Sequence, residues 1–151
     1  MATIGEICNR EVVVATRDTT VNAAAMLMRQ FHVGTLVIVD EVNGGGRVPV
    51  GIVTDRDIVI EIVATGLDPA AITVGDIMVQ ELSSAREGTG ILEAVEIMRH
   101  KGVRRLPIMT AEGRLAGIVS IDDLLETLAG QMSDLTKIVA RGQAHEAKAR
   151  K

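Results

Sequence analysis

Two segments of the chain combine residue types that could bind a ligand. Residues 51–58 read GIVTDRDI and residues 117–124 read GIVSIDDL. In each segment, an apolar run typical of a buried strand leads into the beginning of a helical pattern. A hydroxyl residue stands at the junction and an aspartate follows three positions later. These residues are Thr54 and Asp57 in the first segment, and Ser120 and Asp123 in the second.

The same pattern allows a structural and a functional interpretation. Ser/Thr-x-x-acid before an apolar helix is a capping box, which stabilises a helix by about 1 kcal/mol. Alone, either segment would be read as such a cap. However, a helix N-terminus also attracts phosphate, and a carboxylate can accept two hydrogen bonds from a diol such as ribose. Two copies of the arrangement offer two potential nucleotide clefts.

The two segments belong to an internal duplication. At an offset of 70 positions, 11 of the 35 residues from 5 to 39 are identical to their counterparts. Beyond residue 50 the offset is 66, and the difference falls in residues 41–50, where Asn-Gly-Gly-Gly at 43–46 indicates a hairpin turn. Insertions belong in surface turns, so the change of offset supports the alignment.

The duplication predicts the domain organisation and the fold class. We expect a first repeat over residues 1–66, a linker over 67–73, a second repeat over 74–132 and a charged tail over 133–151. In the first repeat the expected elements are strands at 12–15, 35–39 and 48–53 and helices from residue 20 and at 55–64. In the second they are helices at 91–100 and 121–131 and strands at 105–109 and 115–119. One unit of this size buries too little surface alone, so two α/β (α+β) repeats should pack sheet to sheet with quasi-twofold symmetry. The same symmetry favours a homodimer.

The doubled pattern resembles the CBS-domain pair, in which the wording GIVTDRD is among the most typical. The resemblance covers residues 4–132. It implies two β-α-β-β-α repeats with clefts that bind adenosyl ligands: AMP, ADP or ATP, with NAD or S-adenosylmethionine as lesser candidates. It also implies that Asp57 and Asp123 hold ribose hydroxyls, and that Thr54 and Ser120 lie near ribose or phosphate.

The repeats differ where the family places phosphate-binding residues. Residues 103–107 read VRRLP, similar to the family segment whose basic residues reach the phosphates, which makes Arg104 and Arg105 phosphate candidates. The alternative is plain surface charge. The first repeat reads VGTLV at 33–37, without the basic pair or the proline. We therefore expect unequal sites, and we leave open which site the arginines serve.

Composition narrows the possible partners. The net charge of −4 and the single aromatic residue argue against nucleic acid, which needs a basic surface and stacking platforms. No apolar run approaches the roughly 20 residues of a membrane span. The only cysteine, Cys8, excludes an internal disulfide and suits a cytoplasmic location. The basic residues of 141–151 are interpreted as a solvated, frayed end.

No catalytic or metal-binding constellation is evident. Cys8, His32, His100 and His145 are scattered, without metal-ligand spacing on one element, and Cys8 has no local base. The sequence therefore predicts a regulatory, ligand-sensing module that is not an enzyme and requires no cofactor. It would act through a homodimer or an unknown effector protein. The alternative is a structural or protein-interaction module with empty or vestigial clefts.

Overall fold

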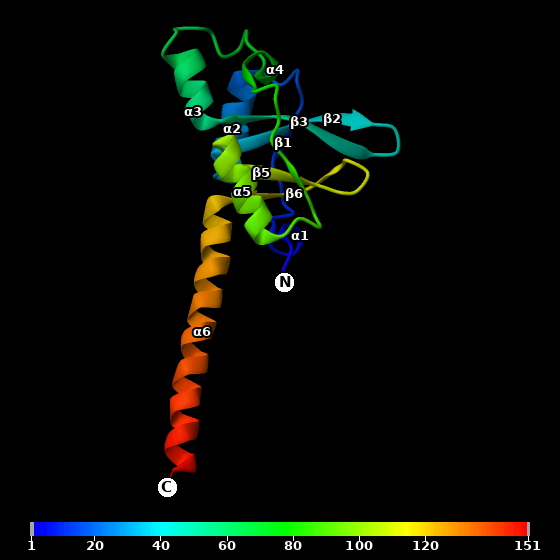
Figure 1. Cartoon of the computed structure of the whole chain (residues 1–151). Helices are drawn as coiled ribbons and strands as arrows, with labels where there is room; N and C mark the ends of the chain where they lie inside the picture. The colour runs from blue at the N-terminus through cyan, green and yellow to red at the C-terminus, as the bar shows by residue number, and fades with distance from the viewer. Residues whose placement is uncertain (1, 151) are drawn as a thin grey trace.

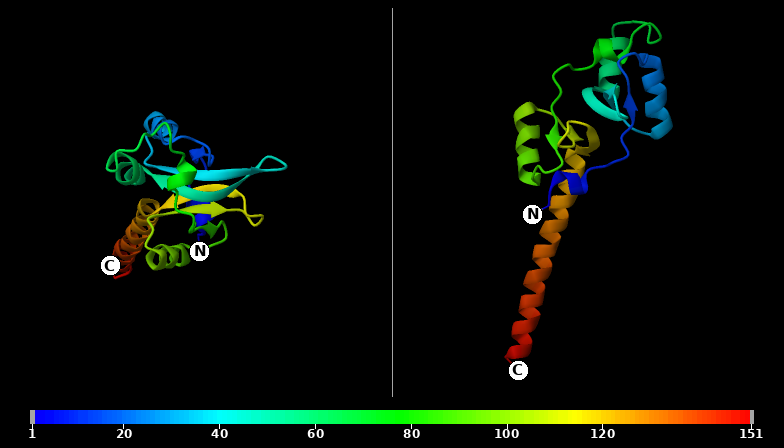
Figure 2. Two further views of the ribbon diagram at one scale, coloured as in Figure 1. Left: turned by 90° about the horizontal axis from the view of Figure 1, so that it is seen from above. Right: turned by 90° about the vertical axis from the view of Figure 1, so that its right-hand side faces the viewer.

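The computed structural model describes residues 2–150 and contains two three-stranded sheets, one from each repeat. The first sheet consists of β1 (Val14–Ala15), β2 (Thr35–Val42) and β3 (Gly46–Thr54). The second consists of β4 (Ala85–Arg86), β5 (Arg105–Met109) and β6 (Leu115–Ser120). In both, the short first strand is parallel to the middle strand and the last two strands form an antiparallel hairpin. Figure 2 shows the two sheets facing each other with helices on their outer sides. The predicted α/β fold class is confirmed.

The paired helices follow the predicted periodicity. α2 (Val21–Phe31) buries Val21, Ala24 and Met28, and α5 (Ile91–Lys101) buries their counterparts Ile91, Ala94 and Met98. Both helices end at a residue with positive φ, His32 at 54° and Gly102 at 67°. A left-handed residue at this place is a common way to end a helix, and it favours glycine. The first repeat therefore ends its helix with a bulkier, less favoured residue than the second.

Two short helices that the sequence analysis did not anticipate are exchanged between the repeats. α1 (Ile4–Ile7) precedes the first repeat but packs in the core of the second, where Ile4 is fully buried. α4 (Val74–Ile77) precedes the second repeat but packs in the core of the first, as does the following Met78. Each sequence repeat thus completes the hydrophobic core of the other.

Backbone contacts hold the exchanged helices at close range. The amide of Gly5 donates to the carbonyl of Glu87 at 3.0 Å, and the amide of Gly75 donates to the carbonyl of Arg17 at 3.1 Å. A Cβ atom at Gly5 would lie 2.7 Å from that Glu87 oxygen, and one at Gly75 would lie 2.8 Å from that Arg17 oxygen. Only glycine permits this approach, which explains why the duplication repeats a glycine at both places.

The last helices of the two repeats differ most from expectation. In the first repeat, α3 (Asp55–Ile58) continues into a π-helical turn, η1 (Val59–Val63). In the second, the helix expected to end near Gln131 is α6 (Ile121–Ala149), 29 residues long, which leaves the globular part of the molecule (Figure 1). Residues 132–149 contain no proline and many good helix formers, so the helix has no reason to stop where the charged tail was expected to begin. Lys151 lies outside the described residues. Within residues 2–150, no helix has both the length and the apolar character of a membrane span.

Candidate functional site

Thr54 and Asp57 form a capping box at the end of β3. The Thr54 amide donates to Oδ2 of Asp57 at 2.9 Å, and the Asp57 amide donates to Oγ1 of Thr54 at 3.2 Å. Ser120 and Asp123 repeat the arrangement at 2.8 and 3.1 Å. The structural interpretation of both motifs is thus confirmed. The capping box uses only one carboxylate oxygen of each aspartate. The other oxygen accepts no hydrogen bond from the described residues, so both aspartates could still bind a ligand.

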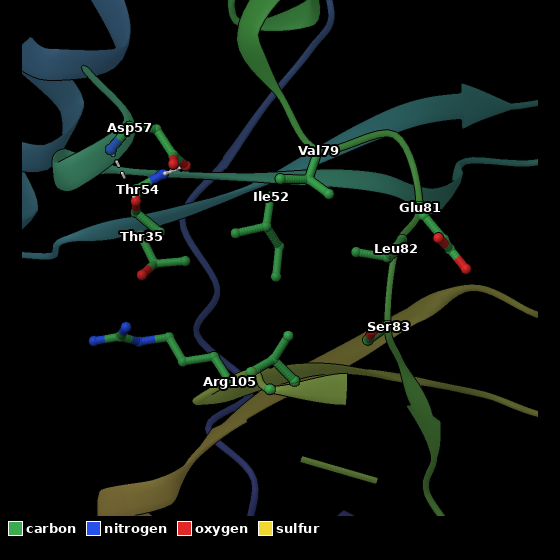
Figure 3. Close-up of a pocket in the computed structure, with 11 residues that line it drawn as sticks. Thr35, Ile52, Thr54, Asp57, Val79, Glu81, Leu82, Ser83 and Arg105 are labelled. Carbon is green, nitrogen blue, oxygen red and sulfur yellow. Dashed lines mark hydrogen bonds between the residues drawn. The ribbon is translucent and has the colours of Figure 1, made fainter. Parts of the chain in front are cut away.

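A pocket of about 330 Å³ lies between the repeats, beside the first of these motifs. Figure 3 shows Thr54 and Asp57 on one side of it and Arg105 on the other. The segment that follows the exchanged helix α4 closes a third side. The lining residues are Thr35, Ile52, Thr54, Asp57, Val79, Glu81, Leu82, Ser83, Gly102, Val103 and Arg105. The volume is within the range of small-molecule sites, and apolar walls with a few convergent polar groups are their usual composition.

Thr35 is a site residue that the sequence analysis missed. Its hydroxyl oxygen is buried, and it is the one buried side-chain polar atom without a hydrogen-bond partner among residues 2–150. A buried hydroxyl without a partner is energetically costly, so a ligand that supplies a partner would gain from it. The alignment of the repeats could have identified Thr35 as a site residue, because Thr35 is the counterpart of the predicted site residue Arg105.

A second pocket, of about 280 Å³, is related to the first by the quasi-twofold symmetry. Four residues of the N-terminal segment line this pocket at positions equivalent to four that line the first. They are Asn9, Glu11, Val12 and Val13, the counterparts of Val79, Glu81, Leu82 and Ser83. The two pockets share Thr35 and Arg105, but the bulkier His32 lines the second where Gly102 lines the first.

The structure therefore brings together only part of the predicted site set. Thr54, Asp57 and Arg105 line the first pocket, whereas Ser120 and Asp123 do not line its counterpart. Arg104 lines neither: it is exposed, and its carbonyl accepts the Ile121 amide at 2.8 Å. Of the two arginines whose site was left open, Arg105 lines both pockets and Arg104 lines neither.

Cys8 is half-buried near the second motif, and the structure gives a testable property to its thiol. Burial raises the pKa of the Cys8 thiol above its ordinary value; Arg10 acts against this, and Glu87 and Asp123 reinforce it. A raised pKa means a smaller thiolate fraction at any given pH, and the thiolate is the nucleophile. We expect the folded protein to react with a disulfide reagent more slowly than the unfolded chain at mildly alkaline pH. The reaction is measured by absorbance with and without guanidinium, and equal rates would contradict this prediction.

The described residues also bear on metal binding. Among residues 2–150, no group of three or more His, Cys, Asp or Glu side chains is placed to hold a metal ion.

Comparison with known proteins identifies the family. The family model for the CBS domain matches residues 4–64 and 74–130. An uncharacterized protein of Methanopyrus kandleri, MK0525, is 38% identical over 123 residues, which are 82% of this chain and 61% of that one. Hypoxic response protein 1 of Mycobacterium tuberculosis is 35% identical over 128 residues, 85% of this chain and 86% of that protein. The chain therefore spans less than two thirds of the first relative but most of the second.

Solved structures agree. The CBS domain pair of protein MJ0100, in complex with 5-methylthioadenosine and S-adenosyl-L-methionine, has a TM-score of 0.74 at 23% identity and matches 87% of this chain and 98% of that one. Hypoxic Response Protein I, with two coordinated zinc ions, has a TM-score of 0.70 at 33% identity over 83% of this chain and 98% of that one. The chain belongs to the CBS-domain family and is a CBS-domain pair, a regulatory module.

Proposed function

We propose that this protein senses an adenosyl ligand, which binds in the first pocket between the repeats. The observation that carries the proposal is the set of polar side chains that line this pocket: Asp57, with one carboxylate oxygen that accepts no hydrogen bond from the described residues, Thr35, with its buried hydroxyl, and Arg105. Asp57 would accept hydrogen bonds from the ribose hydroxyls. Ile52, Leu82 and Val103 would enclose the adenine.

The charge of the pocket favours a ligand with few negative charges. Two carboxylates, of Asp57 and Glu81, line it against the one guanidinium of Arg105. A triphosphate would bring several negative charges into this surrounding, where like charges repel. We therefore propose AMP, or an uncharged or cationic adenosyl compound such as S-adenosylmethionine, before ATP. The MJ0100 domain pair, which has the same fold, holds ligands of the latter class.

The second pocket should bind the same ligands more weakly. The His32 side chain occupies space in the second pocket at the position where Gly102 leaves the first pocket open. In addition, neither Asp57 nor Asp123 lines the second pocket. We propose one principal site per chain. Ligand binding would bias the relative placement of the two repeats, and a homodimer or an effector protein would respond to that change.

The proposal is tested by thermal unfolding with each candidate ligand. A ligand present at 100 times its dissociation constant should stabilise the protein by about 2.7 kcal/mol and raise Tm by roughly 5–10 °C. We expect AMP or S-adenosylmethionine to produce such a shift at lower concentration than ATP, and isothermal titration to give close to one site per chain. If millimolar AMP, ADP, ATP, NAD and S-adenosylmethionine all leave Tm unchanged, the sensing function is refuted in favour of a structural module with empty clefts.

A further inference from the structure

The outer part of α6 exposes an apolar surface that no other element among residues 2–150 covers. Every residue from 129 to 150 is exposed, and Figure 1 shows this part of the helix leaving the two repeats. Large apolar side chains on α6 are between 57% and 66% exposed: Leu125, Met132, Leu135, Ile138 and Val139.

Such a helix lacks the interaction that usually stabilises helices in water. Isolated helices are marginal, and most helical stability in proteins comes from burying an apolar face. The projecting part of α6 buries none, and it contains Gly130 and Gly142, each of which lowers helix stability by about 1 kcal/mol relative to alanine. A partner that covers the apolar face would stabilise this helix.

The spacing of the apolar residues indicates what kind of partner fits. Leu125, Leu128, Met132, Leu135 and Val139 are separated by 3, 4, 3 and 4 positions; Leu128 is half-buried against the core of the second repeat, and the other four are exposed. This is a heptad pattern, in which apolar residues recur every 3.5 residues on average. It favours a left-handed coiled coil with a helix that carries the same pattern. A second copy of α6 meets that requirement.

The charges of α6 set the orientation of the pair. Its first half carries only acidic charges, at Asp122, Asp123, Glu126 and Asp134. Its second half carries mainly basic charges, at Lys137, Arg141 and Lys148, with one acid, Glu146, and Arg150 follows directly after the helix. Two parallel helices would place like charges side by side, whereas two antiparallel helices place the acidic half of each beside the basic half of the other.

We infer that α6 of one chain packs antiparallel against α6 of a second copy through the heptad residues. With the twofold axis level with residues 133 and 134, Leu128 lies level with Val139 of the other copy, and Met132 with Leu135. Glu126 then lies level with Arg141 of the other copy; both lie outside the heptad seam, so they contribute through the longer-range attraction between acidic and basic halves and not as a contact ion pair. The globular parts occupy opposite ends of the helix pair, so this surface is separate from the ligand pockets and the inference does not depend on the proposed function.

The first test compares the masses of the full chain and two variants by sedimentation or light scattering. Leu135→Lys places a charge in the heptad surface, and Ala140→Lys adds the same charge outside it. We expect Leu135→Lys to halve the mass and to reduce the helical circular dichroism signal, because the released helix frays. Ala140→Lys should retain the mass of the unmodified protein. Equal masses for the unmodified protein and Leu135→Lys would overturn the inference, as would an equal loss with Ala140→Lys.

The second test determines the orientation with single cysteines in a Cys8→Ser background. Met132→Cys lies close to the twofold axis and should form a disulfide between two copies under mild oxidation. In the antiparallel pair, two Glu146→Cys residues lie about 37 Å apart and should not. In a parallel pair, both variants would form the disulfide, and that result would overturn the antiparallel arrangement. Failure of Met132→Cys to link would overturn it as well.

Discussion

Replacement of Asp57 by alanine is expected to weaken binding of the adenosyl ligand by about 10- to 100-fold. The reason is the loss of hydrogen bonds from the ribose to a charged acceptor, which typically contribute about 1.5–3 kcal/mol, and 1.4 kcal/mol corresponds to a factor of ten. The measurement is isothermal titration with the ligand that gives the largest thermal shift. Asp123→Ala should have a much smaller effect, because Asp123 lines neither pocket.

The matched control for Asp57→Ala is Asp76→Ala. Asp57 also caps α3, so its loss lowers stability by about 1 kcal/mol, independently of any ligand. Asp76 caps α4 in the same way, accepting the Thr73 amide at 3.0 Å, but it does not line either pocket. Both variants should lose similar stability, and only Asp57→Ala should lose affinity. If Asp76→Ala weakens binding as much, or Asp57→Ala binds normally, the assignment of Asp57 is wrong.

Replacement of Ile4 by alanine is expected to lower the free energy of unfolding by about 2–5 kcal/mol, the usual cost of truncating a fully buried isoleucine. Near a chain terminus such a change is ordinarily mild. Here it should be severe, because Ile4 fills the core of the second repeat through the exchange of α1. Chemical denaturation gives the value.

The control for Ile4→Ala is Leu92→Ala, a comparable truncation at a side chain that is 61% exposed. It should change the free energy of unfolding by no more than about 0.5 kcal/mol.

Met78→Ala is the equivalent test on the other side of the exchange, because Met78 packs in the first core. We expect this truncation to lower the free energy of unfolding by a similar 2–5 kcal/mol. If Ile4→Ala is as mild as Leu92→Ala, then α1 does not contribute to the second core in solution.

The features of this protein that local patterns encode could be predicted from its sequence. The hydroxyl and acid spacing of Thr54 and Asp57 fixed a strand-to-helix junction, and β5 was predicted with its observed bounds because its apolar residues are sharply delimited. The duplication supplied the two-sheet arrangement, since neither unit could bury a core alone.

What depends on packing between distant segments could not be predicted in the same way. Periodicity does not tell which core a short helix such as α1 enters, although the repeated glycines at 5 and 75 were a trace of the close contact. The Thr35 hydroxyl becomes a buried group without a hydrogen-bond partner only when β2 packs in the folded protein, so the sequence alone does not show it. In α6, the charged residues of the tail are typical of a solvated end and obscure the apolar residues at heptad spacing, so the helix was predicted to end about one and a half dozen residues early.

The exchange of α1 and α4 also has a consequence for how this chain arose. In a protein of one repeat, the hydrophobic core would lack a short helix, and the chain's own short helix would have no core to pack in. Only a second molecule could provide the missing helix and the missing core. A half-length ancestor would therefore have been an obligate dimer with exchanged arms, and its true twofold axis would correspond to the quasi-twofold axis between the sheets. Fusion of two such units into one chain would make the exchange intramolecular, at an effective concentration in the millimolar range. It would also allow the two pockets to differ, as they do where Gly102 lines the first and His32 lines the second.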